Sequence, residues 1–152
     1  MGNPGQPSET AVHVNGLPPT KSEAKSLLAA GHPHAGRVRG LLRAAQQTLR
    51  NHEWTTTEAD IGIDLVILGP ARPPSDATNY LGGVGDVLQR KRSSGYLDLE
   101  HLGDLASVAL YLDDRQIRDI RYREEVAESF SYRLRIWVLG GAAPVVSGSA
   151  EM

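Results

Sequence analysis

Hydrophobic residues recur with two different spacings along the chain, which predicts a mixture of strands and helices. Apolar residues at every second position predict strands, and spacings of three and four residues predict helices. The predicted strands are 10–14, 60–68, 116–123 and 131–139. The predicted helices are 21–30, 37–52, 76–92 and 97–108, the last continuing into an extended segment, 108–112. Pro, Gly and Asn between these runs indicate turns.

The predicted strands differ in how much of each would be buried. Segment 60–68 alternates at first and then becomes apolar on both faces, which is typical of a central strand. Segment 10–14 has the pattern of an edge strand, and Pro18-Pro19 after it excludes a helix there. Segments 116–123 and 131–139 are joined by a short acidic loop, so we expect them to form an antiparallel hairpin.

The chain has 152 residues, enough for one domain with one core. We expect that domain to span residues 10–139, between disordered tails at 1–9 and 140–152 that are rich in small residues or proline. Strands and helices in this order predict an α+β fold. The expected architecture is a mixed sheet of about four strands with helices packed on one face.

The amino-acid composition excludes several kinds of site and of protein. Cysteine is absent, which excludes disulfides, thiolate zinc sites and a cysteine nucleophile. The first residues lack a basic start followed by an apolar run, and the longest apolar stretch, 61–70, is too short to span a bilayer. We therefore expect a cytoplasmic protein with no membrane association. The net charge of −2 lacks the basic excess of a dedicated nucleic-acid binder, so any such binding requires a local basic face.

Two groups of arginines could form such a face. One group follows a stripe of the helix 37–52, and the other lies on the predicted face of strands 116–123 and 131–139 that is opposite the core. The members are Arg39, Arg43 and Arg50 on the helix, and Arg121, Arg123, Arg133 and Arg135 on the strands. Each group fits a solvated outer face or a surface that binds phosphates, and the pattern leaves both interpretations open.

Acidic residues around the helix 76–92 are the candidates for chemistry. Asp76 stands at its start, where an aspartate ordinarily caps the helix. Gly82, Gly83 and Gly85 lie inside it, and glycine there is tolerated where something approaches the backbone closely. Asn79, Gly82 and Asp86 share one line of the helix, opposite its apolar side.

The neighbouring residues Asp113 and Asp114 follow the segment 108–112. Adjacent carboxylates repel each other unless they are solvated or bridged by a cation, and Mg²⁺ prefers such oxygen ligands. We therefore predict that Asp76, Asp86 and Asp114 converge around one cleft and bind Mg²⁺, with Asp113 in support. The glycine run 82–85 lacks the Gly-Lys-Ser/Thr of a nucleotide-binding loop, so no small-molecule cofactor is expected.

In their order, these motifs resemble the RusA-type Holliday-junction resolvase family. The matching segments are Asp76-Ala77-Thr78-Asn79, Asp86-Val87-Leu88, Asp113-Asp114-Arg115-Gln116-Ile117 and the first strand with its Pro-Pro exit, 12–19. The resemblance covers most of residues 10–139. It implies a RusA-like homodimer that cuts four-way DNA junctions with Mg²⁺, in DNA recombination and repair. The implied catalytic residues are Asp76, Asn79, Asp86 and Asp114, and the two arginine groups would bind DNA.

The chain departs from the family pattern in three places. Thr78 stands where the second carboxylate of the first motif is expected, and Gly82 where a lysine is expected. Segment 90–104 looks like an insertion. Threonine can offer an oxygen to Mg²⁺ but no charge, so an alternative is a weakly active or inactive relative that binds branched DNA or a protein partner. A small interaction module without a nucleic-acid role is a third possibility.

Overall fold

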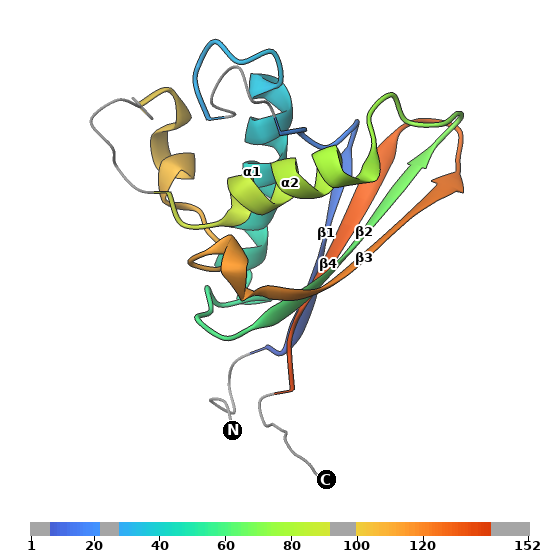
Figure 1. Ribbon diagram of the computed structural model, residues 1–152. Helices are drawn as coiled ribbons and strands as arrows, with labels where there is room; N and C mark the ends of the chain where they lie inside the picture. Colours follow the sequence, from blue (N-terminus) through green and yellow to red (C-terminus); the bar gives the residue numbers. More distant parts are fainter. Residues whose placement is uncertain (1–6, 22–27, 92–99, 141–152) are drawn as a thin grey trace, which may run out of the picture.

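A computed structural model describes residues 7–21, 28–91 and 100–140 of the chain. Its strands are β1 (Glu9–Asn15), β2 (Ile61–Gly69), β3 (Ile117–Val126) and β4 (Ser131–Val138). Its helices are α1 (Ala35–Arg50), α2 (Ala77–Leu88), and the 3-10 helices η1 (Glu100–Ser107) and η2 (Asp114–Gln116). The four strands form one mixed sheet, and the helices lie on one side of it (Figure 1). The predicted α+β architecture is therefore confirmed.

The strand order in the sheet is β1-β4-β2-β3. β4 is antiparallel to both β1 and β2, whereas β3 is parallel to β2. The predicted hairpin of β3 with β4 is wrong, because β2 lies between these two strands. The reason is burial: β2 is buried along nearly its whole length on both faces, whereas most of β3 is exposed. The strand that buries the most apolar surface occupies the centre.

The core forms between the sheet and the two α helices. From α1, the side chains of Val38, Leu41, Leu42 and Ala45 are buried against it. From α2, the buried side chains include Tyr80, Val84 and Val87. Both helices thus bury the apolar side that the sequence predicts for them. The central strand β2 contributes Ile61, Leu65 and Ile67, each at most 1% exposed.

Helix α2 ends at Leu88, four residues before the predicted end. Gln89 has an extended backbone and forms a bridge with Tyr111. Next to it, the backbone N–H of Arg90 donates to the Tyr111 carbonyl at 2.9 Å, and that of Leu110 donates to Leu88 at 2.9 Å. The chain therefore leaves the helix because pairing with the extended segment 108–112 satisfies its backbone instead.

Three further predictions fall close to the undescribed ranges. The predicted helix 97–108 is described from Glu100 and is a 3-10 helix, broken at Gly103, whose φ of 56° is non-helical. Most of the predicted helix 21–30 lies outside the described residues, as do 1–6 and 141–152 of the predicted tails. Strand β1 begins at Glu9, inside the predicted N-terminal tail.

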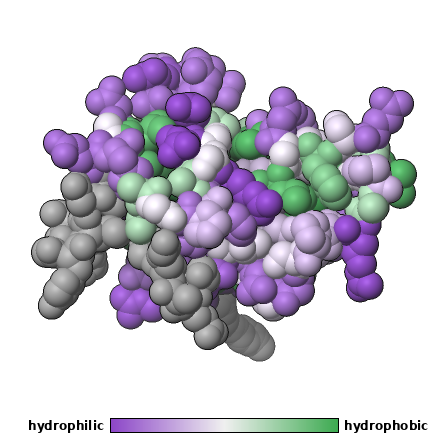
Figure 2. Space-filling view, turned by 90° about the horizontal axis from the view of Figure 1, so that it is seen from above, coloured by the Kyte–Doolittle hydropathy of each residue, from purple (hydrophilic) through white to green (hydrophobic). Residues whose placement is uncertain are grey.

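The surface is largely hydrophilic where it is described. Figure 2 shows one face from above, where the coloured hydrophobic residues lie in small groups between hydrophilic ones. Two large apolar side chains are well exposed, Ile120 at 55% and Val126 at 92%, both on the edge strand β3. Across the described ranges, no helix has the length and apolar character needed to cross a membrane.

Candidate functional site

Asp76 caps the first turn of α2. Its Oδ1 accepts hydrogen bonds from the backbone N–H of Asn79 at 2.8 Å and from the Thr78 hydroxyl at 2.9 Å. The side-chain amide of Asn79 lies 3.5 Å from the other carboxylate oxygen. The Asn79 N–H, followed by the Thr78 hydroxyl, lowers the pKa of Asp76. The ordinary capping role is thus present, and Asn79 and Thr78 serve the same turn.

The glycines of α2 allow a close approach by the chain's own backbone. A Cβ at Gly83 would overlap the carbonyl group of Pro19. A Cβ at Gly82 would lie 3.2 Å from Cδ of Lys21, and the backbone N–H of Lys21 donates to the Asn79 carbonyl at 3.1 Å. The close approach expected from these glycines is therefore observed, and segment 19–21 is what approaches.

Asp86 and Asp114 line a common pocket beside α2. The pocket has a volume of about 310 Å³. Its polar lining comes from Lys21, Thr78, Asp86 and Asp114, and its apolar lining from Ile63, Leu81, Ile117 and Ile120, with Gly82 and Gly85. Two of the predicted site carboxylates, distant in sequence, are thus brought together.

Asp86 is the half-buried carboxylate of this pocket, whereas Asp114 is exposed. Burial raises its pKa, and the negative charge of Asp114 adds to the rise. The ammonium of Lys21 acts in the opposite direction, since Nζ lies 3.6 Å from Oδ2 of Asp86. The Lys21 side chain is 58% exposed and that of Asp86 26%. A positive charge is therefore already present where the two carboxylates meet.

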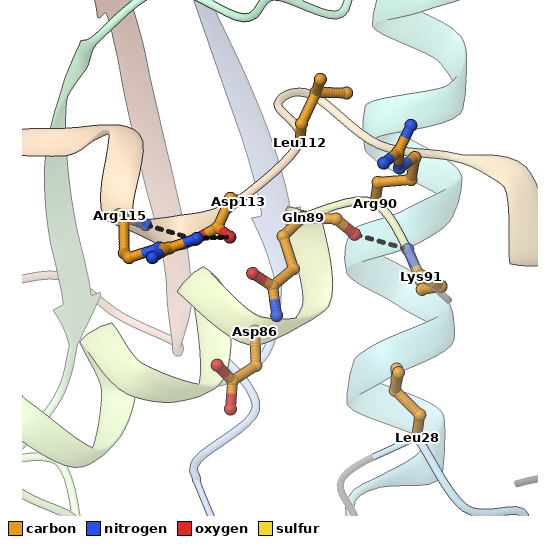
Figure 3. A pocket seen from close by; sticks show the side chains of 8 residues that line it. All are labelled: Leu28, Asp86, Gln89, Arg90, Lys91, Leu112, Asp113 and Arg115. Carbon is orange, nitrogen blue, oxygen red and sulfur yellow. Dashed lines mark hydrogen bonds and ion pairs between the residues drawn. The ribbon is translucent and has the colours of Figure 1, made fainter. Parts of the chain in front are cut away.

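A second pocket, of about 390 Å³, lies on the other side of Asp86 (Figure 3). Its lining residues are Leu28, Asp86, Gln89, Arg90, Lys91, Leu112, Asp113 and Arg115. Lys91 donates to the Val108 carbonyl at 2.6 Å, and burial lowers its pKa to about 8. Asp86 lines both pockets.

The carboxylate of Asp113 is hydrogen-bonded and ion-paired to its neighbour Arg115. The Asp113 carboxylate accepts from the backbone N–H of Arg115 at 2.8 Å and from its guanidinium at 3.1 Å, as Figure 3 shows. These hydrogen bonds lower the pKa of Asp113. In the same turn, Gln116 accepts from the N–H groups of Leu112 and Asp113 and donates to the Thr57 and Ala59 carbonyls. Asp113 is therefore part of a capped turn that positions Asp114.

The described residues do not fit a magnesium site built from three carboxylates. No three His, Cys, Asp or Glu side chains in the described ranges are gathered closely enough to hold a metal ion. Asp76 precedes Asp86 by ten residues on α2, which separates them by about 15 Å along the axis. Asp86 and Asp114 remain as a pair, and Lys21 already contacts Asp86.

Lys21 and Gln89 are site residues that sequence reasoning missed. Gln89 accepts a hydrogen bond from the backbone N–H of Asp114 at 3.0 Å, which ties the end of α2 to η2. The available signal for Lys21 was indirect, because the glycines of α2 indicate an approaching segment without naming it. Nothing in the local pattern marks Gln89, which the sequence places in the interior of a longer helix.

The arginines on α1 form no ion pair with any carboxylate of the described residues. Helix α1 contains four arginines and no Asp or Glu. In the part of the chain that the structure describes, no ion pair involves Arg39, Arg43 or Arg50. This stripe is therefore a concentrated positive surface on a protein of negative net charge.

The strand arginines share the predicted face, but carboxylates balance them. Arg121 and Arg135 flank Asp64 in register, and Arg123 and Arg133 flank Val66. The ion pairs join Arg121 to Asp119, Arg123 to Asp64 and Glu125, and Arg135 to Glu9 and Asp64. Asp64 is only 7% exposed. Of these four arginines, Arg133 alone has no ion pair among the described residues.

Trp137 extends the same face of the sheet. Its indole ring lies over Gly62, where a Cβ would overlap it. The guanidinium carbons of Arg121 and Arg135 lie 5.2 Å and 4.6 Å from the centre of the ring. These cation–π contacts add to the ion pairs in holding the two arginines against the sheet.

No protein-family model matches this chain, and no curated protein matches it significantly.

Proposed function

We propose that this chain is a RusA-like protein that binds branched DNA through the arginine stripe of α1, without cleaving it. The observation that supports the proposal is how the arginines of that helix differ from the strand arginines in their ion pairs. Arg39, Arg43 and Arg50 have no carboxylate partner in the described residues, whereas three of the four strand arginines do. Arginines free of carboxylates are the ones available to neutralise backbone phosphates.

The carboxylate pocket supports binding without cleavage. Metal-dependent hydrolysis of a phosphodiester needs carboxylates that hold the ion in place. Here Asp86 and Asp114 meet, but Asp76 caps its own helix and Lys21 is paired with Asp86. A pocket with two carboxylates and a competing ammonium favours weak binding of Mg²⁺.

A second candidate function is Mg²⁺-dependent cleavage of four-way junctions. It is favoured by one observation: Asp86 and Asp114 come from separate elements and open into the same pocket as Thr78. In this case Mg²⁺ would be the required cofactor. For both candidates we propose a cytoplasmic homodimer, since a two-fold assembly matches the two-fold symmetry of a four-way junction.

A DNA-binding titration tests the proposal. Fluorescence anisotropy with a labelled four-way junction, a linear duplex of the same length and a single strand would give the three affinities at several salt concentrations. We expect the junction to bind most tightly, with a slope of log K against log salt of about −0.9 for each phosphate contacted. No binding at low salt would refute both candidates and favour an interaction module without a nucleic-acid role.

Two variants identify the binding surface. The double variant with Arg39→Ala and Arg43→Ala should weaken junction binding. Its slope of log K against log salt should be less negative, by the amount expected for the loss of about two phosphate contacts. Arg133→Ala is the matched control, because Arg133 also has no ion pair within the described ranges but lies on the sheet face. Incubation of the junction with the protein and Mg²⁺, against a sample with EDTA, then separates binding from cleavage.

A further inference from the structure

The Lys21 side chain crosses α2 at Gly82 and ends at Asp86. Its methylene groups lie where a side chain at position 82 would be, since a Cβ there would be 3.2 Å from Cδ and 3.4 Å from Cβ of Lys21. The backbone of Lys21 is fixed by its hydrogen bond to the Asn79 carbonyl. Contacts at the backbone, the stem and the ammonium therefore direct this lysine along the helix.

The ammonium arrives where two carboxylates meet. Asp86 and Asp114 both line the pocket, and the negative charge of Asp114 contributes to the raised pKa of Asp86. Such a pair is stabilised by a cation, and the positive charge at 3.6 Å from Asp86 meets that need. A divalent ion binding at Asp86 would have to displace this ammonium or tolerate its repulsion.

We propose that Lys21 is the resident cation of this pocket, and that it excludes divalent metal ions from the Asp86–Asp114 pair. The inference rests on the proposed function, because it gives a physical reason why DNA binding would not lead to metal-dependent cleavage. Lys21 is thus a specificity-determining residue: it decides that the pocket holds an ammonium in place of a metal ion.

The test compares Mg²⁺ binding by two variants in the absence of DNA. Lys21→Met keeps an apolar stem over Gly82 and removes the charge, whereas Lys21→Arg keeps the charge. Calorimetric titration with MgCl2 should show tighter binding by the Met variant than by the parent, by up to about fivefold, the upper end of the effect expected from loss of one exposed ion pair. The Arg variant should resemble the parent. Adding Asp86→Asn to Lys21→Met should abolish the gain.

Equal Mg²⁺ affinities for the parent and Lys21→Met would overturn the inference, because the ammonium would then have no effect on metal binding. If the Met variant does not fold, an Mn²⁺ experiment on the unaltered protein still tests the inference. Equimolar Mn²⁺ should leave the NMR amide signals of Asp86 and Asp114 sharp, and their selective broadening would show that Lys21 does not exclude metal. These measurements contain no DNA, so a failure of the DNA-binding proposal is seen separately in the anisotropy titration.

Discussion

The side-chain oxygen of Gln89 accepts a hydrogen bond from the backbone N–H of Asp114, at 3.0 Å. Gln89 is the first residue after α2, and Asp114 is the first residue of η2. Asp86 lies three residues before Gln89, so this hydrogen bond helps to hold Asp114 near Asp86, together with the backbone pairing of residues 88–90 with 110–111. The pocket therefore depends on where α2 ends.

Replacing Gln89 should uncouple these carboxylates. In Gln89→Ala the turn of Asp114 loses its anchor, so the pKa of Asp86 should fall part of the way toward its ordinary value, while burial, the larger cause of its rise, remains. Loss of the hydrogen bond should cost about 1 kcal/mol of unfolding free energy. NMR titration of the Asp86 carboxyl and urea unfolding measure the two effects. Gln47→Ala, which removes a hydrogen bond to Asn51 on the surface of α1, is the control, and an unchanged Asp86 pKa in Gln89→Ala would contradict the expectation.

Asp76 and Asp86 should affect stability in opposite ways as the pH changes. The pKa of Asp76 is lowered, so its stabilising effect is present above the ordinary value of 3.8 and is lost as the pH falls through the lowered value. The pKa of Asp86 is raised, so its contribution is fully present below 3.8 and is lost as the pH rises through the raised value. Urea unfolding of Asp76→Asn and Asp86→Asn across acid and neutral pH measures both. Relative to the parent, Asp76→Asn should become less stable with rising pH and Asp86→Asn more stable, and two curves with the same sign would refute the assignment.

The hydroxyl of Thr78 should contribute to the low pKa of Asp76. Thr78→Val keeps the shape of the side chain but removes the donor at 2.9 Å, so the pKa of Asp76 should rise while the Asn79 N–H still holds part of the shift. Thr78→Ser retains the hydroxyl and should leave that pKa close to the parent's. NMR titration of the Asp76 carboxyl distinguishes them, and equal values for the Val and Ser variants would mean that the hydroxyl is irrelevant.

The glycines of α2 should differ sharply in their tolerance of alanine. Gly83→Ala places a methyl group on the Pro19 carbonyl, and the displaced backbone should cost about 1–3 kcal/mol. Gly85→Ala meets Cδ1 of Ile117 at 3.8 Å and the Tyr111 hydroxyl at 4.0 Å, both ordinary contacts, and gains up to about 1 kcal/mol of helix propensity. Thermal or urea unfolding compares the two. The Gly83 variant should also lose the Lys21–Asp86 ion pair, because segment 19–21 must move, and equal stabilities would show that the close approach is not needed.

Several features of the fold followed from periodicity. Segment 60–68, which alternates at first and then becomes apolar on both faces, predicted a central strand, and β2 is central and buried. The same two-residue period predicted one shared face for Arg121, Arg123, Arg133 and Arg135, and this holds although the predicted hairpin does not. The side of a strand on which a residue lies depends only on its position within that strand, so it is independent of the neighbouring strand.

The candidate site could be predicted only in part. The sequence indicated Asp76 as a cap and marked Asp86 and Asp114 as acidic residues near one helix. It also placed Asp76 and Asp86 on the same helix, where ten residues of axial rise keep their carboxylates apart. The end of α2 could not be predicted, because Gln89 and Arg90 leave the helix to pair with Tyr111, a partner more than twenty residues away.

The sequence by itself determined the four strands, the two α helices apart from the end of α2, and which side of each faces the core, since these depend on spacings of two to four residues. The tertiary structure alone decided the strand order and the position of Lys21. Insertion of β2 between β3 and β4 depends on comparing the burial of entire strands, and the contact of Lys21 with Asp86 joins residues far apart in the chain. Both depend on packing of the whole domain, which no local pattern records.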